Sequence, residues 1–283
     1  MARIPQIKRW LPLFGMLFLY QYVFAAPVRV LHTEGEVHGF LLLRTPQGKT
    51  IAVGDMTQTI HNKVLTNHLE FHFTDGSVHD EIAVYTQQGN FRLLSYRLVE
   101  KGPSFEHPVE MQVDATTGQV TVHEFKVGKD KDGKDKDGKD KDKVSTHHLD
   151  LPDNLANGLI PIIVKNVPSS ASELSVSMVA ATPKPRVVTF TLTPRGMDSF
   201  SVGGTEHKAK HYIGKIKIGG VAGVVAPLIG KQPPDTDLWI TSGDAPTFLK
   251  SKGPVSADSP VWEIQLTSPE WSQTADLQKN ALH

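Results

Sequence analysis

The chain has 283 residues, 30 basic and 30 acidic side chains, and no cysteine. The lack of cysteine excludes a disulfide framework, a Cys-ligated zinc or iron–sulfur site, and a lipoprotein anchor, which requires a cysteine at the mature N-terminus. Zero formal charge gives no general electrostatic reason for binding nucleic acid, so nucleic acid is not an expected partner. The length suffices for one large domain or two modest ones.

Residues 1–25 have the pattern of a secretory signal peptide. Arg3, Lys8 and Arg9 form a positive start, and an uncharged, mostly apolar run follows. Pro, Gly and Gln interrupt this run, so it falls short of the roughly 20 apolar residues that span a bilayer. The small-residue rule predicts cleavage after Ala25. We expect an exported protein, periplasmic or extracellular, that contacts the membrane only through this segment before cleavage. The alternative is a protein tethered by an uncleaved N-terminal helix.

Residues 26–128 predict an N-terminal β-meander. From His68 to Phe73, the apolar Leu69, Phe71 and Phe73 alternate with polar residues, which is the period of a half-buried strand. Asp75-Gly76 follows as a hairpin-turn dipeptide, because both positions tolerate positive φ. Further strands are expected at residues 82–85, 91–99, 111–115 and 119–127, with turns at 88–90 and 116–118.

Residues 129–143 repeat a five-residue Lys/Asp/Gly unit with 7 Lys and 6 Asp and no apolar side chain. Such a segment cannot bury enough surface to offset the entropy of ordering, so it predicts a disordered charged loop. The spacing of its glycines and carboxylates does not fit an EF-hand calcium loop.

Residues 144–271 predict a helix followed by the C-terminal β half of the same domain. Pro152-Asp153 is a plausible helix start, and Pro161 and Gly158 predict a short helix or a kinked pair of turns ending before Pro168. Strands are expected at residues 174–180, 186–193, 211–218, 238–241 and 262–266. The tail at 272–283 lacks a clear period and is expected to be flexible. The predicted fold class is mainly β: a large antiparallel curled sheet, half-barrel or clam-like, with one short helix and the charged loop.

Sequence signatures of catalysis are weak. Ser199 does not lie in the G-x-S-x-G context of a nucleophile elbow. The glycine-rich stretch at residues 219–231 has neither the spacing nor the Ser/Thr of a phosphate-binding loop. No cofactor is implied, and the sequence favours a non-enzymatic protein.

The 13 histidines raise one metal hypothesis. His68, Glu70 and His72 share a strand face, and a two-residue loop at Asp75-Gly76 would place His72 opposite His79 and Glu70 opposite Glu81. Imidazole and carboxylate groups suit zinc, nickel or copper. The simpler interpretation is the solvated face of two antiparallel strands, and the two-residue loop would also set Phe71 against Asp80.

The layout resembles bacterial exported β-rich proteins of unknown function whose antiparallel sheets curl into a half-barrel, loosely like outer-membrane lipoprotein carriers. The resemblance rests on the meander from Gly35 to Val127, on LPDNLANGL at residues 151–159, and on the strand segments Trp239-Ile240 and 260–266. It implies a concave apolar face partly covered by a helix at residues 153–167. It transfers no functional residue.

Two hypotheses lead. In the first, the protein binds a lipid or another hydrophobic or amphipathic small molecule in the concavity of the sheet. The candidate lining residues are Leu155, Leu159, Ile162, Phe190 and Trp239. In the second, an envelope structural or assembly protein acts through its surface. A metal-dependent hydrolase based on His68, Glu70 and His72 is a third alternative. The sequence does not determine the oligomeric state.

Overall fold

The computed structural model describes residues 26–125, 142–202, 205–217, 233–256 and 259–267. Four sequence predictions lie outside these ranges: the signal peptide at 1–25, nearly all of the charged loop at 129–143, the glycine-rich stretch at 219–231, and the tail at 272–283. Asp142 and Lys143 are described, and Lys143 already belongs to a strand.

Fourteen antiparallel strands form one sheet in the described part of the chain. The strands are β1 (Val37–Arg44), β2 (Thr50–His61), β3 (Val64–Phe73), β4 (Val78–Gln88), β5 (Asn90–Lys101), β6 (Val109–Asp114), β7 (Gln119–Glu124), β8 (Lys143–His148), β9 (Leu174–Ala180), β10 (Arg186–Val202), β11 (Thr205–Lys217), β12 (Thr236–Thr241), β13 (Phe248–Pro254) and β14 (Val261–Thr267). Two short helical segments, α1 (Ile160–Ile163) and η1 (Val164–Asn166), lie between β8 and β9.

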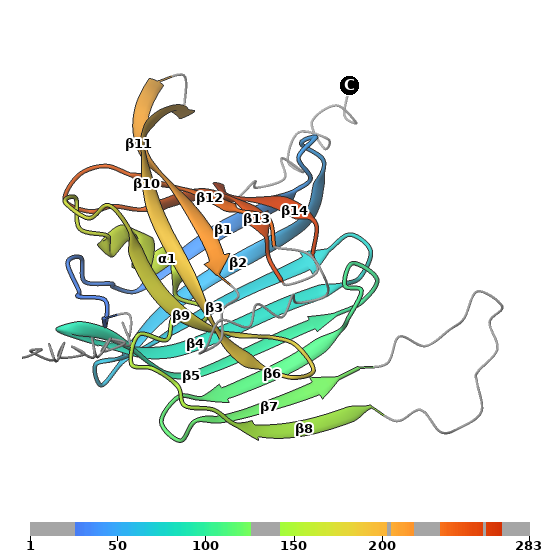
Figure 1. The fold of residues 1–283 in the computed structure, drawn as a ribbon. Coiled ribbons are helices and arrows are strands. Elements are labelled where there is room, and N and C mark those ends of the chain that lie inside the picture. The colour runs from blue at the N-terminus through green and yellow to red at the C-terminus, as the bar shows by residue number, and fades with distance from the viewer. Residues whose placement is uncertain (1–25, 126–141, 203–204, 218–232, 257–258, 268–283) are drawn as a thin grey trace, which may run out of the picture.

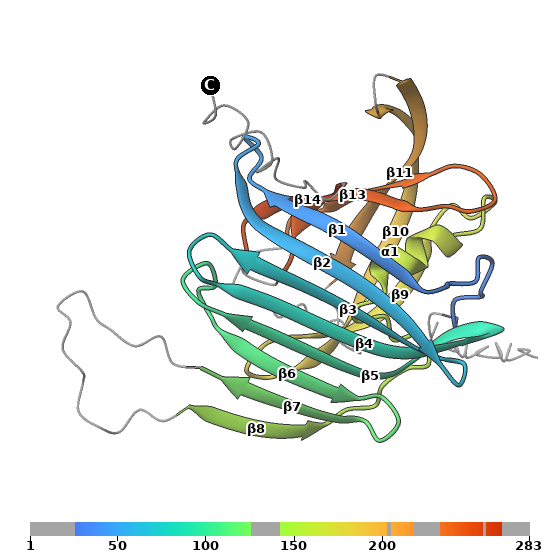
Figure 2. The same cartoon turned by 180° about the vertical axis from the view of Figure 1, so that it is seen from behind.

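The strand order is β8-β7-β6-β5-β4-β3-β2-β1-β14-β13-β12-β11-β10-β9. Each half is a simple meander, and the halves join where β1 pairs with β14. The sheet curls so that β9–β12 face β3–β6 across α1, which both views show (Figures 1 and 2). It does not close, because β8 and β9 end the order without pairing to each other. The predicted mainly β, curled antiparallel fold with one short helix is therefore confirmed.

The larger hydrophobic cluster joins the two halves of the sheet. It brings β3–β7 together with α1, η1 and β9–β12, and includes the fully buried Leu65, Met111, Leu159 and Leu192. Alternation explains this, since one face of each strand points into the concavity. Residues from both halves of the sheet therefore share one core.

A second, smaller cluster lies where β1–β3 meet β14. Its centre is aromatic: the Phe73 ring lies 5.4 Å from that of Phe105 and 5.5 Å from that of Trp262, measured between centroids. Tilted and edge-to-face arrangements of this kind add stability beyond the area they bury. This cluster stabilises the point at which the first and last described strands join.

The edge of the sheet at β9 is covered by another part of the chain. The segment before α1 runs beside the outer edge of β9, where the Ala156 amide donates to the Ser177 carbonyl at 2.8 Å. The Asn157 side chain accepts from the Val179 amide at 2.8 Å and donates to the Val179 carbonyl at 2.9 Å. This segment therefore covers the β9 edge much as a further strand would.

The predicted helix at residues 153–167 is shorter than expected. Pro152-Asp153 does not start it; α1 begins at Ile160 with Pro161 in its first turn. Residues 154–157 instead pair with β9, and Gly158, at φ +70°, turns the chain into the helix. The alternative prediction, a kinked pair of turns ending before Pro168, matches α1 followed by η1.

Candidate functional site

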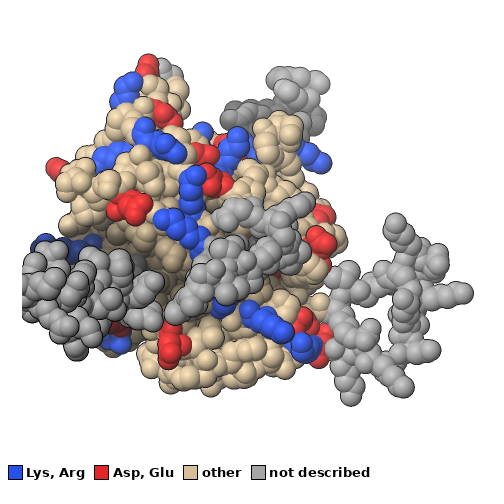
Figure 3. All heavy atoms as spheres, viewed as in Figure 1, with Lys and Arg blue, Asp and Glu red and all other residues tan. Residues whose placement is uncertain are grey.

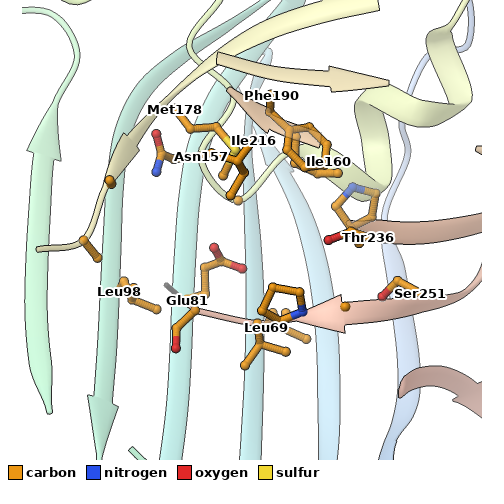
Figure 4. Close-up of a pocket in the computed structure, with 18 of the residues that line it drawn as sticks. Leu69, Glu81, Leu98, Asn157, Ile160, Met178, Phe190, Ile216, Thr236 and Ser251 are labelled. Atoms are coloured by element: carbon orange, nitrogen blue, oxygen red, sulfur yellow. The ribbon is translucent and has the colours of Figure 1, made fainter. Parts of the chain in front are cut away.

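A cavity of about 260 Å³ lies on the concave side of the sheet (Figure 4). Strands β3–β6 form its floor, and β9–β14 form the opposite wall together with α1 and the segment before it. Most of its lining is aliphatic or aromatic, as in sites that bind small hydrophobic molecules. Its volume lies just below the roughly 300–1,000 Å³ of drug-sized sites.

The apolar wall follows from alternation in β9 and β10. Met178, Val188 and Phe190 point inward on these paired strands. The Phe190 ring lies over Gly214 of β11, where even one added carbon would collide with it. The glycine therefore allows the aromatic ring to form part of the cavity wall.

The floor of the cavity contains one half-buried carboxylate. Glu81 of β4 lies directly between Leu69 of β3 and Leu98 of β5 in the cross-strand register. The Tyr96 hydroxyl donates to Glu81 Oε1 at 2.6 Å. Burial, followed by the charge of Glu81, raises the pKa of Tyr96 well above its ordinary value, so the phenol remains a donor. This arrangement orients an acceptor group within a mainly apolar surface.

A buried histidine–carboxylate pair lies beside Glu81. His79 Nδ1 is 3.0 Å from Glu100 Oε1, and both residues are almost completely buried. Burial lowers the pKa of His79, but the hydrogen bond and charge of Glu100 and the charges of Glu81 and Asp80 outweigh it, so the pKa is raised. His79 also reaches the cavity lining. The inward face of β4 thus carries an imidazole and a carboxylate two residues apart.

The predicted ligand-binding residues separate into three groups. Phe190 lines the cavity. Leu155, Leu159 and Ile162 lie nearby but are buried in the packed core. Trp239 lies on the opposite face of β12: its ring stacks on His211 at 4.6 Å between centroids, and its Nε1 donates to Asp198 at 2.7 Å. Leu238 and Ile240 take the inward positions instead.

The register predicted for the metal hypothesis is wrong. The β3–β4 loop has three residues, Thr74 to Gly76, because the Phe73 amide donates to the Ser77 carbonyl at 2.9 Å and Gly76 adopts φ +85°. A three-residue loop with a left-handed glycine is a common hairpin connection. The longer loop shifts every pair by one residue and sets Phe71 opposite His79, which removes the predicted conflict with Asp80.

The five candidate metal ligands consequently lie on two faces. His68, Glu70 and His72 point outward, whereas His79 and Glu81 point into the concavity. Outside, His72 Nε2 is 3.1 Å from Glu70, and His68 Nε2 is 3.5 Å from Asp80. Among the residues that the structure describes, no three His, Asp or Glu side chains are grouped closely enough to hold a metal ion.

Sequence reasoning missed the polar lining residues Tyr96 and Asn157, and also Glu100, which pairs with His79. A signal for the inward direction of His79 and Glu81 did exist, since they alternate with Ala83 and Tyr85, both fully buried. Ile82 and Val84, at the alternate positions of the same strand, are also apolar, so the sequence pattern alone does not show which face of the strand points inward.

Outside the cavity, charged side chains of both signs intermingle on the face shown in Figure 3. Among the described residues, no helix is long and apolar enough to cross a membrane.

Comparisons with known proteins give no family. No family model and no curated protein matches the chain. One similar solved structure is a β-barrel-like protein of a domain of unknown function, DUF1849, from Brucella abortus, with TM-score 0.44, 8% identity, and coverage of 85% of this chain and 98% of that one. Another is the hypothetical lipoprotein YmcC from Escherichia coli, with TM-score 0.37, 12% identity, and coverage of 82% and 85%. Likenesses this remote carry no argument about function.

Proposed function

We propose that this protein binds a hydrophobic or amphipathic small molecule in the cavity on the concave side of its sheet. The observation that carries the proposal is the cavity itself, a space of about 260 Å³ with a mainly apolar lining. Close packing is the rule in protein interiors, so an apolar space of this size between two walls of one sheet favours an occupant.

The polar residues of the lining support an amphipathic ligand in particular. Glu81, Tyr96 and Asn157 lie on the lining beside aliphatic residues. A few oriented polar groups in an apolar site fix the direction in which a ligand lies. The ligand's chain would lie against β9 and β10, and its polar end would meet β4.

Lipid extraction and mass spectrometry of the natively purified protein test the proposal. We expect a co-purifying apolar or amphipathic compound, and we expect the purified protein to enhance the fluorescence of N-phenylnaphthylamine. Val188→Trp, which fills the cavity, should abolish this enhancement. Val187→Trp on the other face of β10 should retain it, provided that circular dichroism shows both variants folded. Absence of both lipid and probe binding would contradict the proposal and favour a protein that acts through its surface.

We also propose that the chain is exported, on the basis of its N-terminal sequence. The positive residues Arg3, Lys8 and Arg9 precede an interrupted apolar run and small residues that fit a signal-peptidase site after Ala25. Mass spectrometry of the mature protein should find Ala26 at the N-terminus. An intact Met1 would contradict cleavage.

A further inference from the structure

The floor of the cavity places a single carboxylate in an apolar cross-strand row. Reading across β3, β4, β5 and β6, the paired inward residues are Leu69, Glu81, Leu98 and Met111. In Figure 4, Glu81 lies between Leu69 and Leu98, across from Met178 and Phe190. Packing alone would favour an aliphatic side chain at this position, because an ionised group loses hydration in such surroundings.

One oxygen of this carboxylate is available to a ligand. Oε1 accepts the hydroxyl of Tyr96 at 2.6 Å, whereas Oε2 receives no hydrogen bond from the residues that the structure describes. Glu81 is only half-buried and lines the cavity, so its carboxylate is not sealed within the core. A carboxylate is an acceptor only, so the group that completes this site must donate a hydrogen bond.

No Lys or Arg among the described residues of the cavity wall neutralises Glu81. The described lining residues include no Lys or Arg. The neighbouring His79 is already paired with Glu100, so its positive charge when protonated is matched by that carboxylate. The nearby Arg97 lies on the outer face, where it contacts Asp80 and Glu110. The cavity therefore carries uncompensated negative charge at its polar end, which attracts a cation and repels an anion.

Resting on the proposed function, we infer that the ligand is a short, single-chain amphiphile whose polar end is an amine, held by Glu81. An ammonium group supplies both the donor and the opposite charge, and such charge-assisted hydrogen bonds are about twice as strong as neutral ones. A fatty acid of the same length would place its carboxylate against Glu81. The cavity thus selects between amphiphiles by the charge of their polar end.

Competition for bound N-phenylnaphthylamine by decylamine, decanol and decanoate at neutral pH tests the inference. We expect decylamine to displace the probe at a concentration at least about tenfold lower than decanoate, with decanol between them. Glu81→Gln should bring the three ligands close together. Glu70→Gln, a matched change on the outer face of the adjacent strand β3, should leave the preference unchanged.

A second variant keeps the test decisive if Glu81→Gln does not fold. Tyr96→Phe removes the internal donor and leaves both oxygens of Glu81 available, so the preference for decylamine should persist or increase. Equal affinity for decylamine and decanoate, or a preference that survives Glu81→Gln, would overturn the inference while probe binding still supports the proposed function. Failure to bind the probe and all three competitors would overturn both.

A vesicle experiment identifies the source of the amine. The protein is mixed with phosphatidylcholine vesicles with and without stearylamine, in parallel with free decylamine. Sedimentation with the stearylamine vesicles that is lost in Glu81→Gln would indicate an amine held in a membrane. Binding of free decylamine alone would indicate a soluble amphiphile. Uptake from neither source would overturn the inference.

Discussion

His79 shows how one carboxylate can make a fully buried histidine compatible with a β-sheet core. Glu100 on the neighbouring strand lies directly opposite it, and the two side chains are 3.0 Å apart. Burial alone would favour neutral imidazole, whereas the pair favours the charged form, and the net result is a raised pKa. The protonated pair therefore contributes to the stability of the folded state.

This predicts a decrease in stability as the pH rises. The pKa of His79 is higher in the folded protein than its unfolded-state value of 6.5. Protonation of His79 therefore stabilises the folded state fully below pH 6.5, and this contribution is lost as the pH rises through the pKa of the folded state. The urea midpoint should therefore begin to fall as the pH rises above 6.5 and should continue to fall through the raised pKa of folded His79. His79→Gln should flatten this dependence, whereas His72→Gln on the exposed face should not. A midpoint that rises with pH, or an equal slope in His79→Gln, would contradict the assignment.

Gly158 lies where the chain comes closest to the floor of the cavity. Its φ is +70°, and a Cβ there would lie 2.8 Å from Ala83 Cβ and 3.2 Å from the Tyr96 ring. Gly158→Ala should therefore cost more than the roughly 1–3 kcal/mol of left-handed backbone alone. Gly76→Ala, at φ +85° with nothing within 4 Å, supplies the control. Equal losses of stability in the two variants would show that the close approach is not tight.

At the scale of elements, the Asn157 side chain hydrogen-bonds the edge of β9, as a neighbouring strand would otherwise do. Its amide contacts both the amide and the carbonyl of Val179 and is buried. Asn157→Ala should destabilise the protein by about 1–3 kcal/mol, because it leaves buried backbone groups unpaired. Hydrogen exchange at the Val179 amide should accelerate.

The neighbouring Asn154 is the matched control for Asn157. Its side chain donates only a long 3.5 Å bond to the Ser175 carbonyl, and its Oδ1 is buried without a partner. Asn154→Ala should therefore cost clearly less and leave exchange at Val179 unchanged. A similar cost in both variants would indicate loss of packing rather than loss of the edge contacts.

Period-two patterning predicted individual strands well. The expected strand at residues 174–180 coincides with β9, and the alternation of Leu69, Phe71 and Phe73 gives their shared buried side. Strand β13 was missed because its sequence, FLKSKGP, has few apolar residues. Strand β8 was missed because it directly follows the Lys/Asp repeat.

Features that depend on neighbouring strands were harder to predict. One extra loop residue between β3 and β4 decided which side chains share the cavity with Glu81. Trp239 was expected to line the concavity, but its neighbours Leu238 and Ile240 are the buried, inward-pointing residues of β12, so Trp239 lies on the other face. Pro152-Asp153 was predicted to start a helix, but the residues that follow, 154–157, pair with β9 instead.

At the scale of the whole molecule, one core spans both halves of the sheet. Met111 and Val122 of the first half share a cluster with Val176 and Leu192 of the second. The protein should unfold in one cooperative transition, with far-ultraviolet circular dichroism and tryptophan fluorescence giving the same midpoint. Two separated transitions would contradict this prediction.

The pairing of β1 with β14 also sets the order in which the molecule can be completed. Phe40 pairs with Thr267, so the seam in the middle of the sheet joins residues from nearly opposite ends of the described chain. Contacts of such long sequence separation form slowly, and until β14 arrives β1 presents an unpaired edge that invites aggregation. We expect the sheet of a newly made chain to remain incomplete until β14 is available. Such a chain would need a chaperone to protect it before it folds, or would have to be exported while still unfolded.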